Sequence, residues 1–267
     1  MSTYRPKMDR RLWLVQHGET PIIACALHDG HVVRPEIAEI LALTEEEQLR
    51  EENPYTVMWS TITDTRIVGL RSRFEVDLNR PKETAIYNNP SDAKNIRIWS
   101  SPPSKDVLLE LIAGHKAFYF DVTQTLKEVE RQFGHFIVLD IQSYNHRRDG
   151  PDQPRASQLT NPDINIGTVF KNRDYWAPII DGFISDLRAY DFMGKHLDVR
   201  ENIKFKSSYF TDWLNNSFPE TGCGIVVDVK KFFMDEWTGE LFPDVHEAVR
   251  QTLVIAKAGM MKRLEKY

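Results

Sequence analysis

The sequence predicts an α/β protein in which residues 1–267 form a single three-layer domain, with a mixed central sheet between two layers of helices. Three observations support this prediction. Short apolar runs typical of strands alternate with longer amphipathic stretches typical of helices. Internal repeats and low-complexity tracts are absent from the chain. Hydrophobic residues make up 41% of the chain and charged residues 27%, as in ordinary soluble globular proteins.

The first third of the chain predicts four strands and one helix. "RLWLVQ" (11–16) and "PIIACAL" (21–27) are short apolar runs separated by a glycine-containing turn, which is typical of two strands. Residues 34–52 have a helical period and many glutamates, so they predict a helix. Further strands are expected at residues 65–70 and 73–79.

The rest of the chain continues the alternation. Residues 103–133 predict a long amphipathic helix, and the nearly contiguous apolar residues of 135–144 predict a buried strand. Residues 145–174 are rich in Asp, Asn, Pro and Arg and predict a loop, and loops of this length are usually functional. The remaining expected elements are a helix at 175–190, a strand at 224–232 and a helix at 243–267.

Charge and cysteine content limit the class of protein. The formal net charge is −5, which argues against a nucleic-acid partner. No apolar run approaches the roughly 20 residues that span a bilayer, and the polar N-terminus lacks the apolar core of a signal peptide. We expect Cys25 and Cys223 to be buried thiols rather than a disulfide. We therefore expect a cytoplasmic protein without a membrane or nucleic-acid partner; its oligomeric state stays open.

Polar segments follow four of the expected strands. They are "LHDGH" (27–31), "DLNR" (77–80), "DIQSYNH" (140–146) and "VVDVKK" (226–231). In α/β sheets, ligands bind beyond the carboxyl ends of the strands. These four segments are therefore the first candidates for a functional site.

A fifth segment, "LVQHGET" (14–20), resembles the histidine-phosphatase signature, in which an arginine precedes the nucleophilic histidine. Here Gln16 precedes His17, so the bidentate phosphate donor is missing. No second phosphate-binding histidine segment is evident downstream. We therefore interpret His17 as a turn residue.

The segments 27–31 and 72–81 contain residues suited to metal and carboxylate binding. His28 and His31 can face one point in a turn, and neutral imidazole suits Zn²⁺ and similar ions, although an isolated H-x-x-H is more often a surface loop. Two arginines flank the expected strand that ends in Asn79. Guanidinium forks with an amide can recognise a carboxylate, and salt-bridged surface arginines are the alternative.

Four segments together resemble the N-formylglutamate amidohydrolase family. "SRFEVDLNRP" (72–81) is similar to its signature and to the D-L-N-R element of the zinc carboxypeptidase and aspartoacylase superfamily. "PIIACALHDGH" (21–31) and "VLDIQSYNHRR" (138–148) resemble the segments that carry metal-binding histidines, and "VVDVKKFFMDEWTGE" (226–240) resembles the strand with the catalytic carboxylate. They occur in the family's order. The resemblance implies a zinc-peptidase-like α/β/α hydrolase fold.

The resemblance also implies a site for Zn²⁺ or another divalent metal. His28 matches the first ligand, and His31 stands where the superfamily's H-x-x-E pattern has its glutamate. Glu52 or Glu51, in "REENPYT", is a competing source of that ligand. Gln142 stands where the family has its second histidine ligand.

The catalytic and substrate-binding roles are implied in the same way. Asp228 matches the general base or acid, with Glu236 as the fallback. A metal would activate water and polarise the amide carbonyl, while Asp228 moves the proton to the leaving amine. The residues implied to hold a substrate carboxylate are Arg73, Asn79 and Arg80. Arg147 and Arg148 are a further anion contact or, alternatively, part of a solvated basic loop.

Departures from the family pattern affect the metal and the substrate. A glutamine oxygen is a poor zinc ligand beside imidazole, so Gln142 predicts weak zinc binding unless His146 or Glu52 compensates. Asp228 is one methylene shorter than the usual glutamate, and serines stand at 207–208 where glycines are expected. The prediction is a metal-dependent hydrolase of a small acidic N-acyl amino acid, such as N-formyl-L-glutamate, or a short peptide. The alternative is a weak or inactive relative that binds a carboxylate-bearing ligand or peptide.

Overall fold

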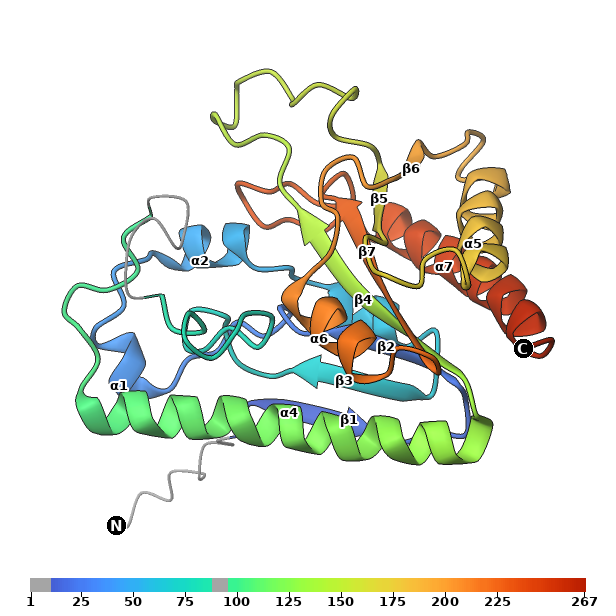
Figure 1. The fold of residues 1–267 in the computed structure, drawn as a ribbon. Helices are drawn as coiled ribbons and strands as arrows, with labels where there is room; N and C mark the ends of the chain where they lie inside the picture. Colours follow the sequence, from blue (N-terminus) through green and yellow to red (C-terminus); the bar gives the residue numbers. More distant parts are fainter. Residues whose placement is uncertain (1–10, 88–95) are drawn as a thin grey trace, which may run out of the picture.

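The computed structural model describes residues 11–87 and 96–267, and within them seven strands form one sheet in the order β1-β3-β2-β4-β7-β5-β6 (Figure 1). The strands are β1 (Trp13–Gln16), β2 (Ile22–Ala26), β3 (Thr65–Gly69), β4 (Phe136–Tyr144), β5 (Ile164–Gly167), β6 (Val199–Glu201) and β7 (Gly222–Lys230). Strands β3, β2, β4 and β7 are parallel, whereas β1 and β5 run antiparallel to their neighbours β3 and β7. The α/β class with a mixed sheet is therefore confirmed.

The central strands are buried on both faces because helices cover both sides of the sheet. Every residue of β2 and of β7 is buried, which explains their continuous apolar runs. Successive side chains of β4 enter different cores: Ile137 and Leu139 pack on one side of the sheet, and Phe136 and Val138 on the other.

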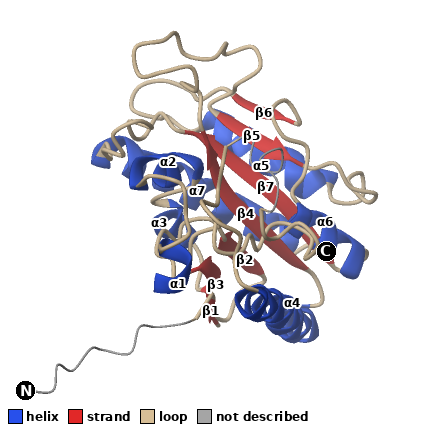
Figure 2. Ribbon diagram, turned by 90° about the vertical axis from the view of Figure 1, so that its left-hand side faces the viewer, coloured by secondary structure: helices blue, strands red, loops and turns tan. Residues whose placement is uncertain are grey.

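The two cores belong to different helices (Figure 2). One face packs against α5 (Ala177–Ala189), α7 (Pro243–Leu264) and the short α3 (Thr56–Ser60). The other face packs against α4 (Lys105–Phe133) and α6 (Tyr209–Ser217). Helix α4 begins where the Ser104 hydroxyl accepts a hydrogen bond from the Val107 N–H, and it ends at Gly134, whose φ is +77°.

Two expected elements are wrong. The helix expected at 34–52 is divided into α1 (Pro35–Ala38) and α2 (Glu45–Glu51), because Thr44 and Glu47 form a capping box that starts a new helix. Residues 73–79 form turns rather than a strand. Their buried carboxylates, Glu75 and Asp77, bind side chains of other segments instead of supporting a strand.

The expected loop at 145–174 contains β5, and three short elements, α3, α6 and β6, were missed by periodicity. The other expected strands and helices are found within a few residues of their predicted bounds. In the described part of the chain, no helix is both long and apolar enough to cross a membrane.

Candidate functional site

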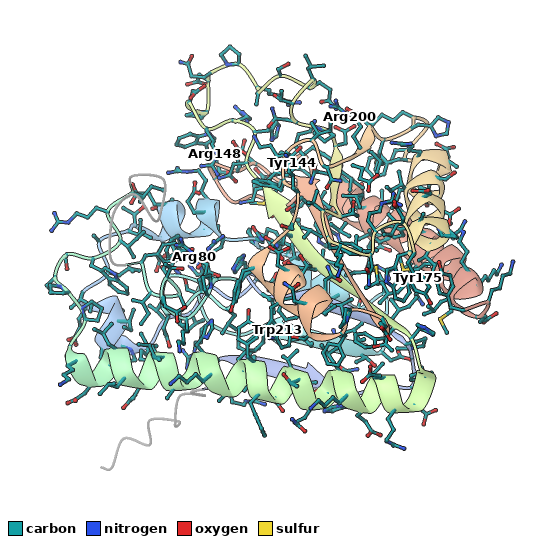
Figure 3. All side chains as sticks on the ribbon, viewed as in Figure 1. Arg80, Tyr144, Arg148, Tyr175, Arg200 and Trp213 are labelled. Carbon is teal, nitrogen blue, oxygen red and sulfur yellow. The ribbon has the colours of Figure 1, made fainter. Side chains whose placement is uncertain are left out.

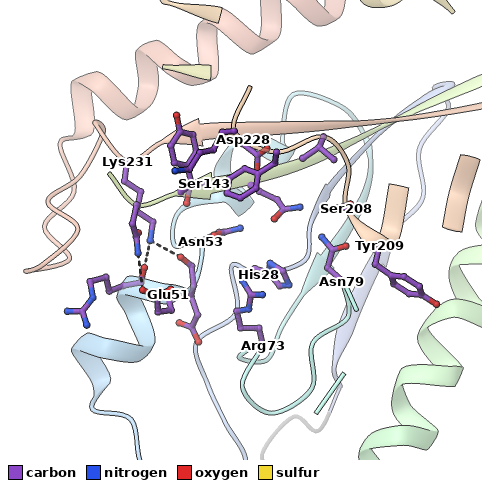
Figure 4. Close-up of a pocket in the computed structure, with 18 of the residues that line it drawn as sticks. His28, Glu51, Asn53, Arg73, Asn79, Ser143, Ser208, Tyr209, Asp228 and Lys231 are labelled. Atoms are coloured by element: carbon purple, nitrogen blue, oxygen red, sulfur yellow. Dashed lines mark hydrogen bonds between the residues drawn. The ribbon is translucent and has the colours of Figure 1, made fainter. Parts of the chain in front are cut away.

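The parallel strands β2, β4 and β7 end at a cavity of about 450 Å³ (Figure 4). Figure 3 shows Tyr144 and Arg148 at this end of the β4 arrow. Eight of the candidate site residues named from the sequence line it: His28, Glu51, Glu52, Arg73, Asn79, Gln142, Arg148 and Asp228. Ser207 and Ser208 line it too. The segments that follow the strands therefore meet at one place, as expected for ligand sites beyond the carboxyl ends of strands in α/β sheets.

His28 follows β2 directly and is held by a buried carboxylate. Its Nε2 lies 2.6 Å from Oδ1 of Asp77. Burial alone would raise the pKa of Asp77, but the charge of Arg73 and the hydrogen bonds from His28 and Tyr87 lower it well below its usual range. The ionised Asp77 accepts a hydrogen bond from Nε2–H. Nδ1 of His28 is buried and, within the described residues, has no hydrogen-bond partner. This nitrogen is left for a ligand, a metal or a water molecule.

Arg73 and Asn79 line the cavity, whereas Arg80 does not. The Arg73 guanidinium donates to Oδ2 of Asp77 at 2.7 Å and to the Tyr87 hydroxyl at 2.9 Å. Arg80 is stacked over the Tyr87 ring, 4.9 Å from its centroid, and is not among the lining residues. Asn79 accepts from the Phe210 N–H and so ties the turn to the start of α6.

Glu52 lines the cavity, but both of its oxygens already accept hydrogen bonds. Oε2 lies 2.7 Å from Nδ1 of His31, and Oε1 accepts from Gln48 and Ser72. His31 does not line the cavity, and its side chain is 39% exposed. The hydrogen bond to Glu52 raises the pKa of His31. His31 and Glu52 thus form a pair that fixes the turn behind His28.

Gln142 and Asp228 are register partners on β4 and β7. The Gln142 amide donates to Oδ2 of Asp140 at 2.7 Å, and Asn165 donates to Oδ2 of Asp228 at 3.1 Å. Burial raises the pKa of Asp228 to about 8 and also raises that of Asp140. Asp228 is therefore protonated at neutral pH and can donate a proton.

Lys231 is a cavity residue that the sequence reasoning did not single out. It follows β7 directly, is only 1% exposed, and its Nζ donates to the carbonyl oxygens of Arg50 at 2.6 Å and Glu52 at 2.8 Å (Figure 4). Burial lowers its pKa to about 7, although the charge of Glu51 opposes this shift. Its place in the polar segment "VVDVKK" at the end of an expected strand was the available signal.

Glu236 and Arg147 do not line the cavity. The Glu236 carboxylate accepts hydrogen bonds from the backbone N–H groups of His146, at 2.8 Å, and Arg147. Arg147 pairs with Asp235 at 3.2 Å. These contacts hold the start of the loop after β4. Arg148 reaches the cavity and forms an ion pair with Glu51 at 3.0 Å.

The donor set does not fit a three-ligand zinc site. Among the described residues, no three or more His, Cys, Asp or Glu side chains are grouped closely enough to hold a metal ion. The cavity offers one unpartnered imidazole nitrogen, on His28, and the amide of Gln142 where an imidazole was expected. Zinc binding stays a prediction.

Comparisons with known proteins point in one direction. The family model "N-formylglutamate amidohydrolase" matches residues 20–225. A solved N-formylglutamate amidohydrolase from Ralstonia eutropha JMP134 has the same fold, with a TM-score of 0.69 and 15% sequence identity, over 94% of this chain and 98% of the other. A gene product of Agrobacterium tumefaciens has a TM-score of 0.63 and 15% identity, over 96% of each chain. No curated protein matches the sequence.

Proposed function

The chain belongs to the N-formylglutamate amidohydrolase family, and from this premise we propose that it hydrolyses the amide bond of a small N-acyl amino acid that carries a carboxylate, such as N-formyl-L-glutamate. One observation carries the proposal. A histidine with a free, oriented nitrogen, His28, and a protonated carboxyl group, Asp228, line the same cavity. The free nitrogen can accept a proton, and Asp228, whose pKa burial raises to about 8, can donate one at neutral pH.

Amide hydrolysis needs both. Nδ1 of His28 accepts a proton from water as the water oxygen attacks the acyl carbon, while Asp77 holds Nε2 and stabilises the imidazolium. Asp228 donates its proton to the amine nitrogen as the carbon–nitrogen bond breaks, because an amide anion is a poor leaving group. The products are a carboxylic acid, formate for a formyl group, and a free amino acid. The proton on His28 then passes through solvent to restore the acid form of Asp228.

The cavity also suits an anionic substrate. Arg73 lies beside His28, since both bind Asp77, and can place a substrate carboxylate next to the reacting amide. Further cations on the wall are Arg50, Arg148, Lys204 and Lys231. For a divalent metal the cavity offers His28 Nδ1 and the amide oxygen of Gln142, because both Glu52 oxygens already accept hydrogen bonds. This donor set predicts weak zinc affinity.

A second candidate is a carboxylate-binding protein that does not hydrolyse its ligand. It is favoured by Gln142, whose amide donates to Asp140 where the family resemblance places a histidine ligand. This candidate keeps the cations of the cavity and loses the metal.

Formate release from N-formyl-L-glutamate tests the proposal, with and without added zinc. We expect slow formate release by the unmodified protein, and at least about a hundredfold slower release by His28→Gln, because the proton acceptor is lost. His17→Gln is the matched control, since His17 follows β1 and does not line this cavity. Ligand binding without formate release under any condition would favour the second candidate, and equal rates for the His28→Gln variant would refute the proposed acceptor.

A further inference from the structure

We infer that Lys231 recognises the carboxylate of the substrate that is remote from the scissile amide, and so selects N-acyl derivatives of acidic amino acids. This inference rests on the proposed function. It assigns the selection to a residue outside the arginine clamp expected from the sequence.

The position of Lys231 is fixed by the sheet. Its backbone N–H donates to the Tyr144 carbonyl at 3.0 Å, which extends the pairing of β7 with β4 by one residue. Its side chain lines the cavity. The cationic side chains that line the cavity are Arg50, Arg73, Arg148, Lys204 and Lys231, and only Lys231 among them is fully buried.

The Lys231 ammonium group has an unused hydrogen-bond donor. It carries three N–H donors, and two of them reach the carbonyl oxygens of Arg50 and Glu52. Among the described residues, no carboxylate forms an ion pair with Nζ, and the nearby charge of Glu51 offsets its burial only in part. Backbone carbonyls satisfy hydrogen bonds but supply no net charge, and a buried cation without a directly bound counter-ion is costly. An anionic ligand in the cavity would supply both the third acceptor and a directly bound counter-charge.

The place of Lys231 in the cavity selects the remote carboxylate. Arg73 shares Asp77 with His28 and so lies beside the proposed reacting centre. Lys231 instead contacts the turn at the end of α2, and Figure 4 shows it apart from Arg73. A glutamate-like substrate has one carboxylate next to its amide and one at the end of its side chain. The first matches Arg73 and the second matches Lys231.

The neighbouring lysine provides the contrast. Lys230 is also buried, but its Nζ forms an ion pair with Asp163 at 2.8 Å and donates to Gln158 and to the Asn161 carbonyl. Its charge is compensated within the protein, and it does not line the cavity. The two lysines therefore differ in whether a carboxylate of the protein forms an ion pair with the ammonium group.

Calorimetric titration with N-acetyl-L-glutamate and N-acetyl-L-glutamine tests the inference, because the second ligand lacks only the remote charge. In Lys231→Gln the amide can still donate to the two carbonyls. We expect this variant to bind the glutamate ligand about 10- to 100-fold more weakly and the glutamine ligand within about threefold of the unmodified protein. Lys230→Gln should bind both ligands as the unmodified protein does.

Equal affinity of the Lys231→Gln variant for N-acetyl-L-glutamate, or an equal loss for both ligands, would overturn the inference and leave the proposed function in place. Failure of the unmodified protein to bind either ligand would overturn the proposed function and this inference with it. If Lys231→Gln does not fold, Lys231→Arg keeps the charge and should keep the preference for the glutamate ligand. Loss of that preference in a folded Lys231→Arg protein would also overturn the inference.

Discussion

Replacing Asp228 by asparagine should stabilise the protein and abolish its proposed activity. The buried carboxyl group has a pKa of about 8 against an ordinary value near 4. Between these two pH values the native state keeps a proton that the unfolded state has released. Burial of Asp228 therefore costs no stability below about pH 4, and the free energy of unfolding falls as the pH rises toward 8. The asparagine side chain is neutral at every pH, and its carbonyl oxygen can still accept the hydrogen bond from Asn165.

The size of the effect follows from the linkage relation. Each pH unit in this window costs about 1.4 kcal/mol, so the four units give an upper limit of roughly 5 kcal/mol at pH 8. Relaxation of the protein and water entry reduce such values. We therefore expect the free energy of unfolding of the Asp228→Asn variant to exceed that of the unmodified protein by about 1–4 kcal/mol at pH 8 and by little at pH 4.

Urea unfolding at pH 4, 6 and 8 measures this difference directly. Asp163→Asn is a control of opposite sign, because burial would raise the pKa of Asp163 but its hydrogen bond and charge contact with Lys230 lower it. That stabilisation is present above the ordinary pKa and is lost in acid, so Asp163→Asn should lower stability at pH 7. A pH-independent difference between Asp228→Asn and the unmodified protein would refute the buried, protonated state of Asp228.

Three further outcomes are expected. Gln142→His should raise zinc affinity at least tenfold, measured by competition with a chromophoric chelator, because imidazole replaces an amide oxygen; unchanged affinity would place Gln142 outside any metal site. Arg73→Lys should weaken N-acetyl-L-glutamate binding more than Arg80→Lys does, since only Arg73 lines the cavity; calorimetry with both variants would expose the reverse order. Gly30→Ala should lower the free energy of unfolding by more than about 2 kcal/mol, because its Cβ would lie 2.5 Å from the Arg71 backbone nitrogen; a variant as stable as the unmodified protein in urea would contradict this packing.

Periodicity predicted the sheet because its central strands are apolar on both faces. The runs that became β2, β4 and β7 have few polar residues until their carboxyl ends, so both their type and the location of the cavity could be read from the chain. Residues 73–79 misled the same reasoning. Their alternation of polar and apolar residues looks like a half-buried strand, yet both faces are buried, and Glu75 and Asp77 bind distant segments.

The partners of buried polar groups could not be predicted from the sequence. Asp77 stands between residues that were singled out, but its role depends on His28, which is 49 residues away in the sequence. Lys231 likewise depends on the carbonyls of a turn about 180 residues earlier. The free capacity of a side chain is known only after its contacts are known. For the same reason, the sequence could not show that Arg73 lines the cavity and Arg80 does not.

Two buried aspartates at the site have opposite protonation states. Asp77 is buried, but the charge of Arg73 and the hydrogen bonds from His28 and Tyr87 keep it ionised. Asp228 is equally buried, but it receives one hydrogen bond from Asn165 and feels the repulsion of Asp140, so it keeps its proton. One carboxylate can therefore orient a histidine as proton acceptor, while the other acts as proton donor. Amide hydrolysis needs a proton acceptor for the water and a proton donor for the amine, whether or not a metal polarises the carbonyl. The glutamine at position 142, where the family resemblance places a histidine ligand, therefore argues against zinc binding more than against proton transfer.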